Sequence, residues 1–301
     1  MADNRISDLV DRFSRGELSR RDFIKRAVGA GVSASVVATA LAAHAGAAPS
    51  SSTRTATRYQ ADAKTLVIAD ALAGSDWLTL DPGWWYEIHS LAALNVIYEG
   101  LYHVPDGSKP TEIQPLLAEG MPEISADGLT VTVKVRQGVK FHHSGNVMTA
   151  DDFIFSWNRA KNIGYQGSFL ATDYWTEAKA LDPATIQLTL AAPNAAIAAV
   201  LTAMTLTVVD SKVVKENGGT DQPGTDANAT VAAGVSLSGD TAKDYIDNNS
   251  VGTGPYRVVQ YDRNSEIIIE RNPDYWGEAP QLDRIIWRNI IEPTKQLEAV
   301  Q

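Results

Sequence analysis

Three stretches of this sequence carry residue types that often do chemistry in proteins. Phe141-His142-His143-Ser144 contains adjacent histidines, Asp151-Asp152 pairs two carboxylates, and Gly252-Thr253-Gly254-Pro255-Tyr256 is rich in glycine. Adjacent side chains on a strand point to opposite faces, so the two histidines are poorly placed to share a metal ion. Carboxylates in the first turn of a helix stabilise its dipole, which accounts for Asp151 and Asp152 without acid–base chemistry.

Signatures of phosphate binding and nucleophilic catalysis are missing from the sequence. The glycine-rich stretch is not followed by Gly-Lys-Ser/Thr and contains no G-x-G-x-x-G, the two patterns that cradle phosphate groups. A G-x-S-x-G nucleophile elbow does not occur. The chain has no cysteine, which excludes disulfides and thiol chemistry. The sequence therefore predicts a protein that is not an enzyme and that uses no cofactor or metal ion.

Aromatic residues are the better candidates for a binding site. Four of them fall in a loop that follows a predicted first strand, and a weaker second group ends the stretch 165–175. Aromatic side chains supply large, rigid contact surfaces, so we predict a ligand-facing wall; packing between elements is the alternative. The candidate ligand-binding residues are Ser75, Asp76, Trp77, Trp84, Trp85, Tyr86, Tyr174 and Trp175.

Residues 1–47 predict a bacterial export signal of the twin-arginine type. Arg20, Arg21 and Phe23 lie in the stretch S-R-R-D-F-I-K, ahead of the uncharged run 27–43. Small residues allow signal cleavage after Ala45 or after Ala47, and the sequence does not choose between them. The run is close to the lower length limit for a membrane span, about 17 residues, but its weak hydrophobicity makes retention as an anchor the less favoured alternative.

The composition limits the partners of the exported part. The formal net charge is −10, although residues 1–47 hold more basic than acidic residues. An acidic protein is a poor partner for nucleic acid or anionic lipid, which both reward clustered positive charge. Residues 48–63 are polar and small, so we predict a flexible spacer there.

Strand and helix signals alternate from residue 64 onward, which predicts a mixed α/β class. A hairpin turn is expected at Asp127-Gly128, a capping box at Thr149 and Asp152, and a helix end at Gly100. Residues 217–250 predict a long polar excursion with at most a short helix at 242–248. The predicted strands are 64–69, 129–135, 185–190, 256–261, 266–271 and 282–290, and the predicted helices are 87–99, 149–159, 193–206 and one that begins after Pro293.

A series of short motifs in this order resembles the family 5 extracellular solute-binding proteins of ABC importers, the peptide- and nickel-binding type. Two departures stand out: the family's F-H-D-G is Phe141-His142-His143-Ser144-Gly145 here, and Asn249-Ser250 stands where the family has N-P. The stretch 217–248 is also longer and more polar than usual. The motifs are L-D-P at 80–82, I-Y-E-G-L at 97–101, P-L-L-A-E at 115–119, D-G-L-T at 127–130 with V-R-Q-G-V-K-F-H at 135–142, T-A-D-D-F at 149–153, V-G-T-G-P-Y at 251–256 and R-N-P-D-Y-W-G at 271–277.

The resemblance implies a periplasmic-binding-protein-like fold of type II, cluster C. It places residues 64–101 and 207–301 in lobe one and residues 102–206 in a small extra β-rich subdomain. Family members continue past the helix near Glu292 into a second lobe. We therefore expect this chain to hold an N-terminal portion with the second lobe missing, and we transfer none of the residues that grip peptide termini.

The function implied is that of the extracytoplasmic, monomeric substrate-binding component of an ABC importer. Its partners would be an oligopeptide or similar small solute, the permease subunits in the membrane and, during export, the twin-arginine translocase. A secreted hydrolase with an unrecognised site is one alternative. A truncated fragment without a function of its own is the other.

Overall fold

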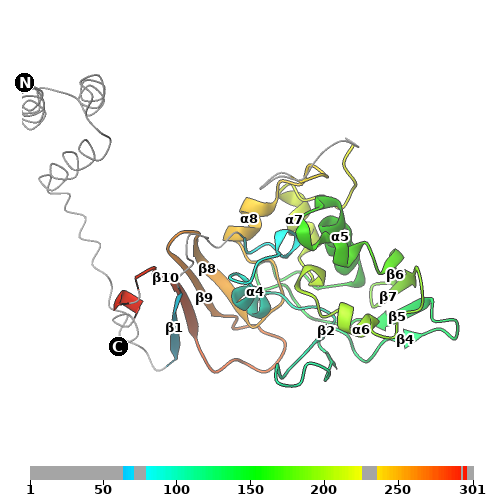
Figure 1. Ribbon diagram of the computed structural model, residues 1–301, viewed down its shortest axis with the longest axis horizontal. Coiled ribbons are helices and arrows are strands. Elements are labelled where there is room, and N and C mark those ends of the chain that lie inside the picture. The colour runs from blue at the N-terminus through cyan, green and yellow to red at the C-terminus, as the bar shows by residue number, and fades with distance from the viewer. Residues whose placement is uncertain (1–63, 71–78, 226–235, 293, 297–301) are drawn as a thin grey trace, which may run out of the picture. The chain divides into compact units, whose positions relative to one another are not determined.

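The computed structural model describes residues 64–70, 79–225, 236–292 and 294–296 (Figure 1). All of them belong to one compact unit, residues 61–301. The predicted export signal and spacer, residues 1–63, lie outside the described residues. Within the part of the chain that the structure describes, no helix has the length and apolar character that crossing a membrane requires.

One four-stranded sheet joins the two ends of this unit, in the order β1-β10-β9-β8. β1 (Thr65–Asp70) runs parallel to β10 (Arg284–Asn289). β9 (Glu266–Arg271) and β8 (Tyr256–Asp262) continue the sheet in antiparallel fashion. Three consecutive isoleucines of β9, residues 267–269, are all buried, as expected for a strand that is covered on both faces.

A second four-stranded sheet is entirely antiparallel, in the order β4-β5-β7-β6. Alternate residues of β5 and β7 are buried, so one face packs on the core. A separate two-stranded ribbon pairs β2 with β3. The strands are β2 (Tyr102–His103), β3 (Gln114–Pro115), β4 (Glu123–Ile124), β5 (Thr130–Lys134), β6 (Trp175–Asp182) and β7 (Thr185–Leu190).

The longest described helix, α5 (Ala150–Ile163), begins and ends at sequence signals. The Asp152 carboxylate accepts the backbone N–H of Thr149 at 2.8 Å and its hydroxyl at 3.1 Å, and Gly164 ends the helix at φ 73°. Figure 1 shows α4, α7 and α8 between the two sheets. The shorter elements are α4 (Leu91–Ile97), α6 (Ile197–Val200), α7 (Ser211–Glu216), α8 (Lys243–Asn248) and the 3-10 turns η1 (Pro82–Trp84), η2 (Gln166–Ala171) and η3 (Met204–Leu206).

Buried apolar residues form two clusters that meet at α5. The cluster on the β4-β5-β7-β6 sheet extends from Leu101 to Val208 and takes Phe153 and Trp157 from α5. The cluster on the β1-β10-β9-β8 sheet takes Phe155 from the same helix. We propose two subdomains on this division, with the boundaries predicted above, 64–101 and 207–301 against 102–206.

The strands expected at 64–69, 129–135, 185–190, 256–261, 266–271 and 282–290 are present, and the helix expected at 149–159 continues to Ile163. The turn at Gly128 has φ 73° and joins β4 to β5, so the predicted hairpin is confirmed. The short helix expected at 242–248 is α8. Of the helix expected after Pro293, residues 294–296 are helical and 297–301 lie outside the described residues.

Two expected helices are shorter than predicted, the expected helix end at Gly100 was wrong, and one strand was missed. Of the helix expected at 87–99, only α4 forms. It ends before Tyr98, which has an extended backbone (φ −118°, ψ 145°) and a buried side chain. Gly100 therefore does not end a helix. The helix expected at 193–206 is only α6 and η3. β6 was not predicted, because its sequence carries exposed charged residues that are typical of an edge strand.

Candidate functional site

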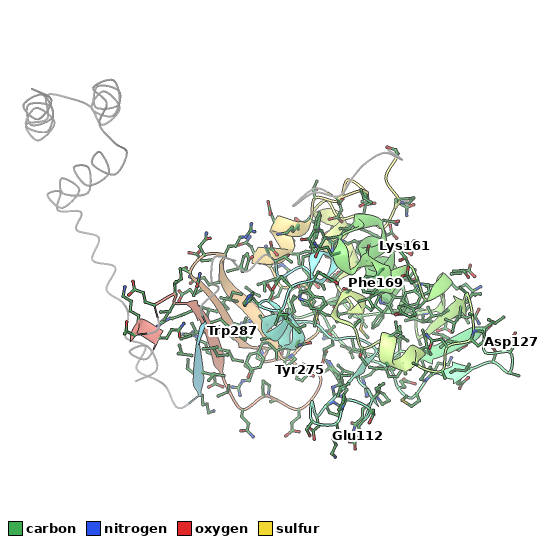
Figure 2. The ribbon with its side chains drawn as sticks, in the orientation of Figure 1. Glu112, Asp127, Lys161, Phe169, Tyr275 and Trp287 are labelled. Carbon is green, nitrogen blue, oxygen red and sulfur yellow. The ribbon has the colours of Figure 1, made fainter. Side chains whose placement is uncertain are left out.

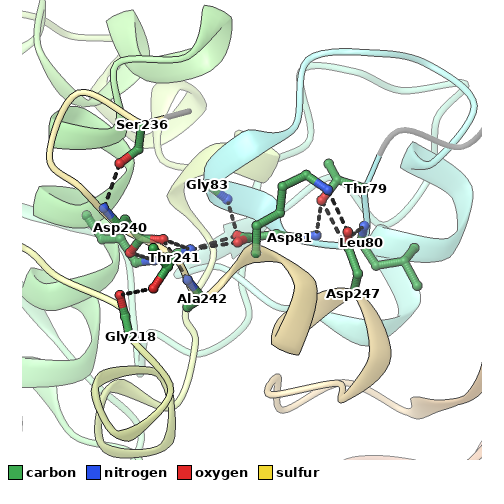
Figure 3. Close-up of polar contacts among 12 residues, drawn as sticks. Thr79, Leu80, Asp81, Gly83, Gly218, Ser236, Asp240, Thr241, Ala242 and Asp247 are labelled. Atoms are coloured by element: carbon green, nitrogen blue, oxygen red, sulfur yellow. Dashed lines mark hydrogen bonds and ion pairs between the residues drawn. The ribbon is translucent and has the colours of Figure 1, made fainter. Parts of the chain in front are cut away.

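The aromatic loop, residues 79–90, is fixed at its base by buried charges (Figure 3). The Arg159 guanidinium on α5 donates two hydrogen bonds to Asp81, at 2.8 and 2.6 Å, and two to Asp240, at 2.8 and 2.9 Å. All three side chains are at most 1% exposed. We call these three residues the Arg159 cluster. Burial lowers the pKa of Arg159, but the adjacent charges of Asp81 and Asp240 more than offset this and raise it above its ordinary value.

A second carboxylate holds the start of the same loop. Asp247 on α8 accepts the hydroxyl of Thr79 and the backbone N–H of Leu80, each at 2.6 Å, and pairs with Lys243 at 2.6 Å. Burial raises the pKa of Asp247. The loop is therefore tied to α5 and to the polar segment that ends in α8, two elements far away in the sequence.

Gly83 is required by the close packing of this loop on α5. Its N–H donates to Asp81 at 2.9 Å. A Cβ at this position would lie 2.9 Å from Nη1 of Arg159 and 3.1 Å from the Ile163 side chain, distances that leave no room for it. The L-D-P motif and the glycine after it thus form a structural anchor, which positions the aromatic residues that follow.

The described aromatic residues of this loop differ in their surroundings. Trp84 is 3% exposed and packs against Tyr165, with ring centroids 5.3 Å apart. Trp85 is half-buried, and its indole N–H donates to the carbonyl of Glu87. Tyr86 is 51% exposed, and Ile88 beside it is 82% exposed. Trp84 is therefore buried, Trp85 packs partly against the core, and Tyr86 is the exposed ring of the loop.

The second predicted group is divided in the same way. Trp175 is buried at the start of β6 and packs against Trp157, with centroids 5.3 Å apart. Tyr174 is half-buried. The burial of Trp84 and Trp175 favours the alternative of packing between elements for these two residues, and a ligand-binding role for either stays a prediction. Ser75, Asp76 and Trp77 lie outside the described residues, and a binding role for Trp85, Tyr86 and Tyr174 stays a prediction.

Sequence reasoning missed a buried carboxylate that joins three of the motifs. Glu99 is 4% exposed and accepts hydrogen bonds from Thr253 at 2.8 Å, Tyr275 at 2.7 Å and Trp276 at 2.8 Å. We call these four residues the Glu99 cluster. Arg136 lies over the Trp276 ring, 4.8 Å from its centroid. Burial raises the pKa of Glu99, although its three donors lower it in part. A glutamate within an otherwise apolar motif, I-Y-E-G-L, was the available signal.

The glycine-rich stretch at 252–254 packs against the end of α4. The Gly254 N–H donates to the Ile97 carbonyl at 3.0 Å, and a Cβ on Gly252 would lie 2.2 Å from that oxygen. The glycines therefore allow a close approach between two backbone segments, and the Thr253 hydroxyl between them reaches Glu99. The stretch thus forms a tightly packed entry into β8, and the sequence already lacked the phosphate-loop patterns.

The two adjacent histidines have separate partners. His142 is partly buried, with Nε2 3.3 Å from the Ile97 carbonyl, and burial lowers its pKa to about 4. His143 Nε2 lies 3.1 Å from the Tyr245 hydroxyl. Of the predicted carboxylate pair, Asp152 is buried and also accepts from Ser211, whereas Asp151 is exposed. Among the described residues, no group of three or more potential ligands could hold a metal ion.

Comparison with a solved structure shows that the chain has the fold of part of a periplasmic binding protein. A periplasmic binding protein from Helicobacter pylori, DppA, in complex with the peptide STSA, is 26% identical, with a TM-score of 0.62; the match covers 78% of this chain and 44% of that one. The chain belongs to the bacterial extracellular solute-binding proteins, family 5, whose sequence profile ("family 5 Middle") matches residues 112–301.

Curated relatives agree with this family. The glutathione-binding protein GsiB of Salmonella typhi is 26% identical over 252 residues, which are 79% of this chain and 41% of that protein. The dipeptide-binding protein of Escherichia coli (strain K12) is 31% identical over 194 residues, which are 59% of this chain and 32% of that protein. The chain thus spans less than half the length of the relatives that it matches.

Proposed function

We propose that this protein is the substrate-binding component of an ABC importer that captures a peptide-like or other small solute outside the cytoplasm. The match to a peptide-bound solute-binding protein over 78% of this chain carries the proposal. The dipeptide-binding and glutathione-binding relatives point to the same ligand class. They give no support to the alternative of a secreted hydrolase. We further propose that the protein is a monomer and delivers its solute to the permease.

The geometry of the aromatic loop supports a role in binding. Trp85 and Tyr86 present ring surface, and the loop that carries them is anchored through Asp81 to Arg159 and through Leu80 to Asp247. A binding surface that is rigid before the ligand arrives loses less conformational entropy on binding. Closure of a second domain over such a surface is a common way to enclose a small solute. The anchored loop would thus serve as one fixed wall.

Calorimetric titration of the full chain with di-, tri- and tetrapeptides tests this proposal. We expect saturable binding, and we expect Tyr86→Ala to weaken it about tenfold without lowering the stability of the fold. Trp85→Ala should also weaken binding, but with a loss of stability, because Trp85 packs partly against the core. Thr172→Ala, at another exposed position, is the control and should bind as the parent does. The absence of saturable heat with every peptide up to about 1 mM would contradict the proposal.

We also propose that residues 1–47 direct export through the twin-arginine translocase. The support is the stretch S-R-R-D-F-I-K before an uncharged run. Replacing Arg20 and Arg21 together by lysine should leave precursor in the cytoplasm, as seen in a fractionation blot. The paired change Arg12→Lys and Arg15→Lys keeps the charge and spares the motif, so it should not affect export. Equal export of both double variants would rule out this route.

A further inference from the structure

A cavity of about 670 Å³ lies apart from every candidate ligand-binding residue. Two segments line it: residues 138–145, in the turn before α5, and residues 272–276, between β9 and β10. Tyr275, labelled in Figure 2, marks the second segment. Small-molecule sites in proteins span about 300–1,000 Å³, so this cavity is large enough to hold a ligand of its own.

The aromatic residues of this cavity have their polar atoms turned away to internal partners. The Tyr275 hydroxyl and the Trp276 indole N–H both donate to Glu99. The third ring, that of Phe141, is buried. The amide of Asn272 is also satisfied, since Nδ2 donates to the Gly254 carbonyl at 3.3 Å and Oδ1 accepts from the Asp274 N–H at 3.1 Å. Tyr275 and Trp276, both half-buried, therefore offer ring surface to a ligand within a lining that is otherwise largely polar.

The charged residues of the cavity are exposed and have opposite signs. Lys140 and Asp274 both line it, and neither side chain makes an ion pair or hydrogen bond with another described residue. His142, which also lines the cavity, has its pKa lowered to about 4 by burial, so it adds no charge at neutral pH. One ammonium and one carboxylate beside aromatic surface match a ligand that carries both charges and an apolar body.

We propose that this cavity is a second ligand site, for a small zwitterion with an aromatic body such as an aromatic amino acid. The ligand carboxylate pairs with Lys140, its ammonium pairs with Asp274, and its ring packs on the half-buried rings of Tyr275 and Trp276. Charge-assisted hydrogen bonds of this kind are stronger than neutral ones, so each contributes to selection as well as to affinity. The site shares no residue with the anchored aromatic loop.

Titration of the full chain with L-phenylalanine tests the site, with two probes that each lack one charge. We expect 3-phenylpropionate, without the ammonium, and 2-phenylethylamine, without the carboxylate, to bind about tenfold more weakly than the amino acid. Lys140→Gln should remove the advantage of phenylalanine over phenylethylamine. Asp274→Asn should remove its advantage over phenylpropionate. Both changes are at exposed positions, so the fold should be unaffected.

Matched controls and a competition arm make the result decisive. Lys161→Gln and Glu123→Gln alter exposed charges outside the cavity and should bind phenylalanine as the parent does. Saturating peptide should leave phenylalanine binding unchanged, as should Tyr86→Ala. Displacement of phenylalanine by peptide would place the amino acid at the peptide site and overturn the proposal. Unchanged phenylalanine affinity in both Lys140→Gln and Asp274→Asn would also overturn it, and so would the absence of saturable phenylalanine binding. Failure of peptides to bind would refute the proposed function and leave this test intact.

Discussion

The Arg159 and Glu99 clusters both bury carboxylates between segments far apart in the sequence, but they neutralise them differently. In the Arg159 cluster a single guanidinium serves two carboxylates through four hydrogen bonds. In the Glu99 cluster the carboxylate meets only neutral donors, from Thr253, Tyr275 and Trp276. Ionic pairing keeps a buried charge ionised, whereas neutral donors leave the cost of burial partly uncompensated. We therefore expect loss of the Arg159 cation to lower the stability of the fold strongly. The stability that the Glu99 cluster contributes should depend on pH.

The sharpest test of this contrast is Arg159→Met, for which we expect the largest effect. The change leaves Asp81 and Asp240 buried without their partner, and breaking a buried ion pair in this way costs about 3–5 kcal/mol of unfolding free energy. Urea denaturation of the full chain measures it. Lys161→Met, at an exposed position on the same helix, is the control and should stay within about 0.5 kcal/mol of the parent. A loss below about 1 kcal/mol for Arg159→Met would mean that the cluster is not a structural anchor.

A second test separates the anchor from the surface that it carries. Trp84→Ala removes a core indole beside Asp81 and should cost about 3–5 kcal/mol of stability. Tyr86→Ala, two residues later in the same loop, removes a ring that is 51% exposed and should change stability by less than about 0.5 kcal/mol. Thermal and urea unfolding of the two variants give the comparison. Equal losses would show that the loop does not divide into a core part and an exposed part.

The third test uses the pH dependence that the Glu99 cluster predicts. Burial raises the folded pKa of Glu99 above its ordinary value of 4.5, so the folded state holds this proton more tightly than the unfolded chain. The resulting stability is fully present below pH 4.5 and is lost as pH rises through the raised folded pKa. A tenfold difference in proton affinity between the folded and unfolded states corresponds to about 1.4 kcal/mol of unfolding free energy.

Glu99→Gln removes this titration while it keeps the shape of the side chain. Denaturation midpoints of parent and variant between pH 4 and 7 should therefore converge or cross as the pH rises, with the parent losing stability relative to Glu99→Gln. Asp247 and Asp152, whose pKa values burial also raises, titrate in both proteins and cancel in the difference. A constant difference across this range would mean that Glu99 does not titrate with a raised pKa.

Local contacts could be predicted from the sequence alone, whereas contacts between distant segments could not. Alternating strands such as β7 and the Thr149 start of α5 are local signals, and they predicted these elements correctly. Arg159 lies on a predicted helix, but its partners are 78 and 81 residues away, so its burial depends on contacts that no local pattern shows. Trp84 and Tyr86 are two residues apart and share the same sequence neighbourhood. The sequence does not show that Trp84 is buried against Tyr165 while Tyr86 is exposed.

The smallest expected effect concerns a third polar contact, the start of α5, where both partners lie within one turn. The Asp152 carboxylate accepts the Thr149 hydroxyl at 3.1 Å and its N–H at 2.8 Å. Thr149→Ala removes the hydroxyl together with the γ-methyl group but keeps the N–H contact, and loss of such a cap typically costs about 1 kcal/mol. Thr149→Ser retains the hydroxyl and should recover most of that loss in the same urea titration. Because this contact is local, its cost should add to that of Arg159→Met in the double variant, and a strongly non-additive result would show that the helix start and the ion cluster act as one unit.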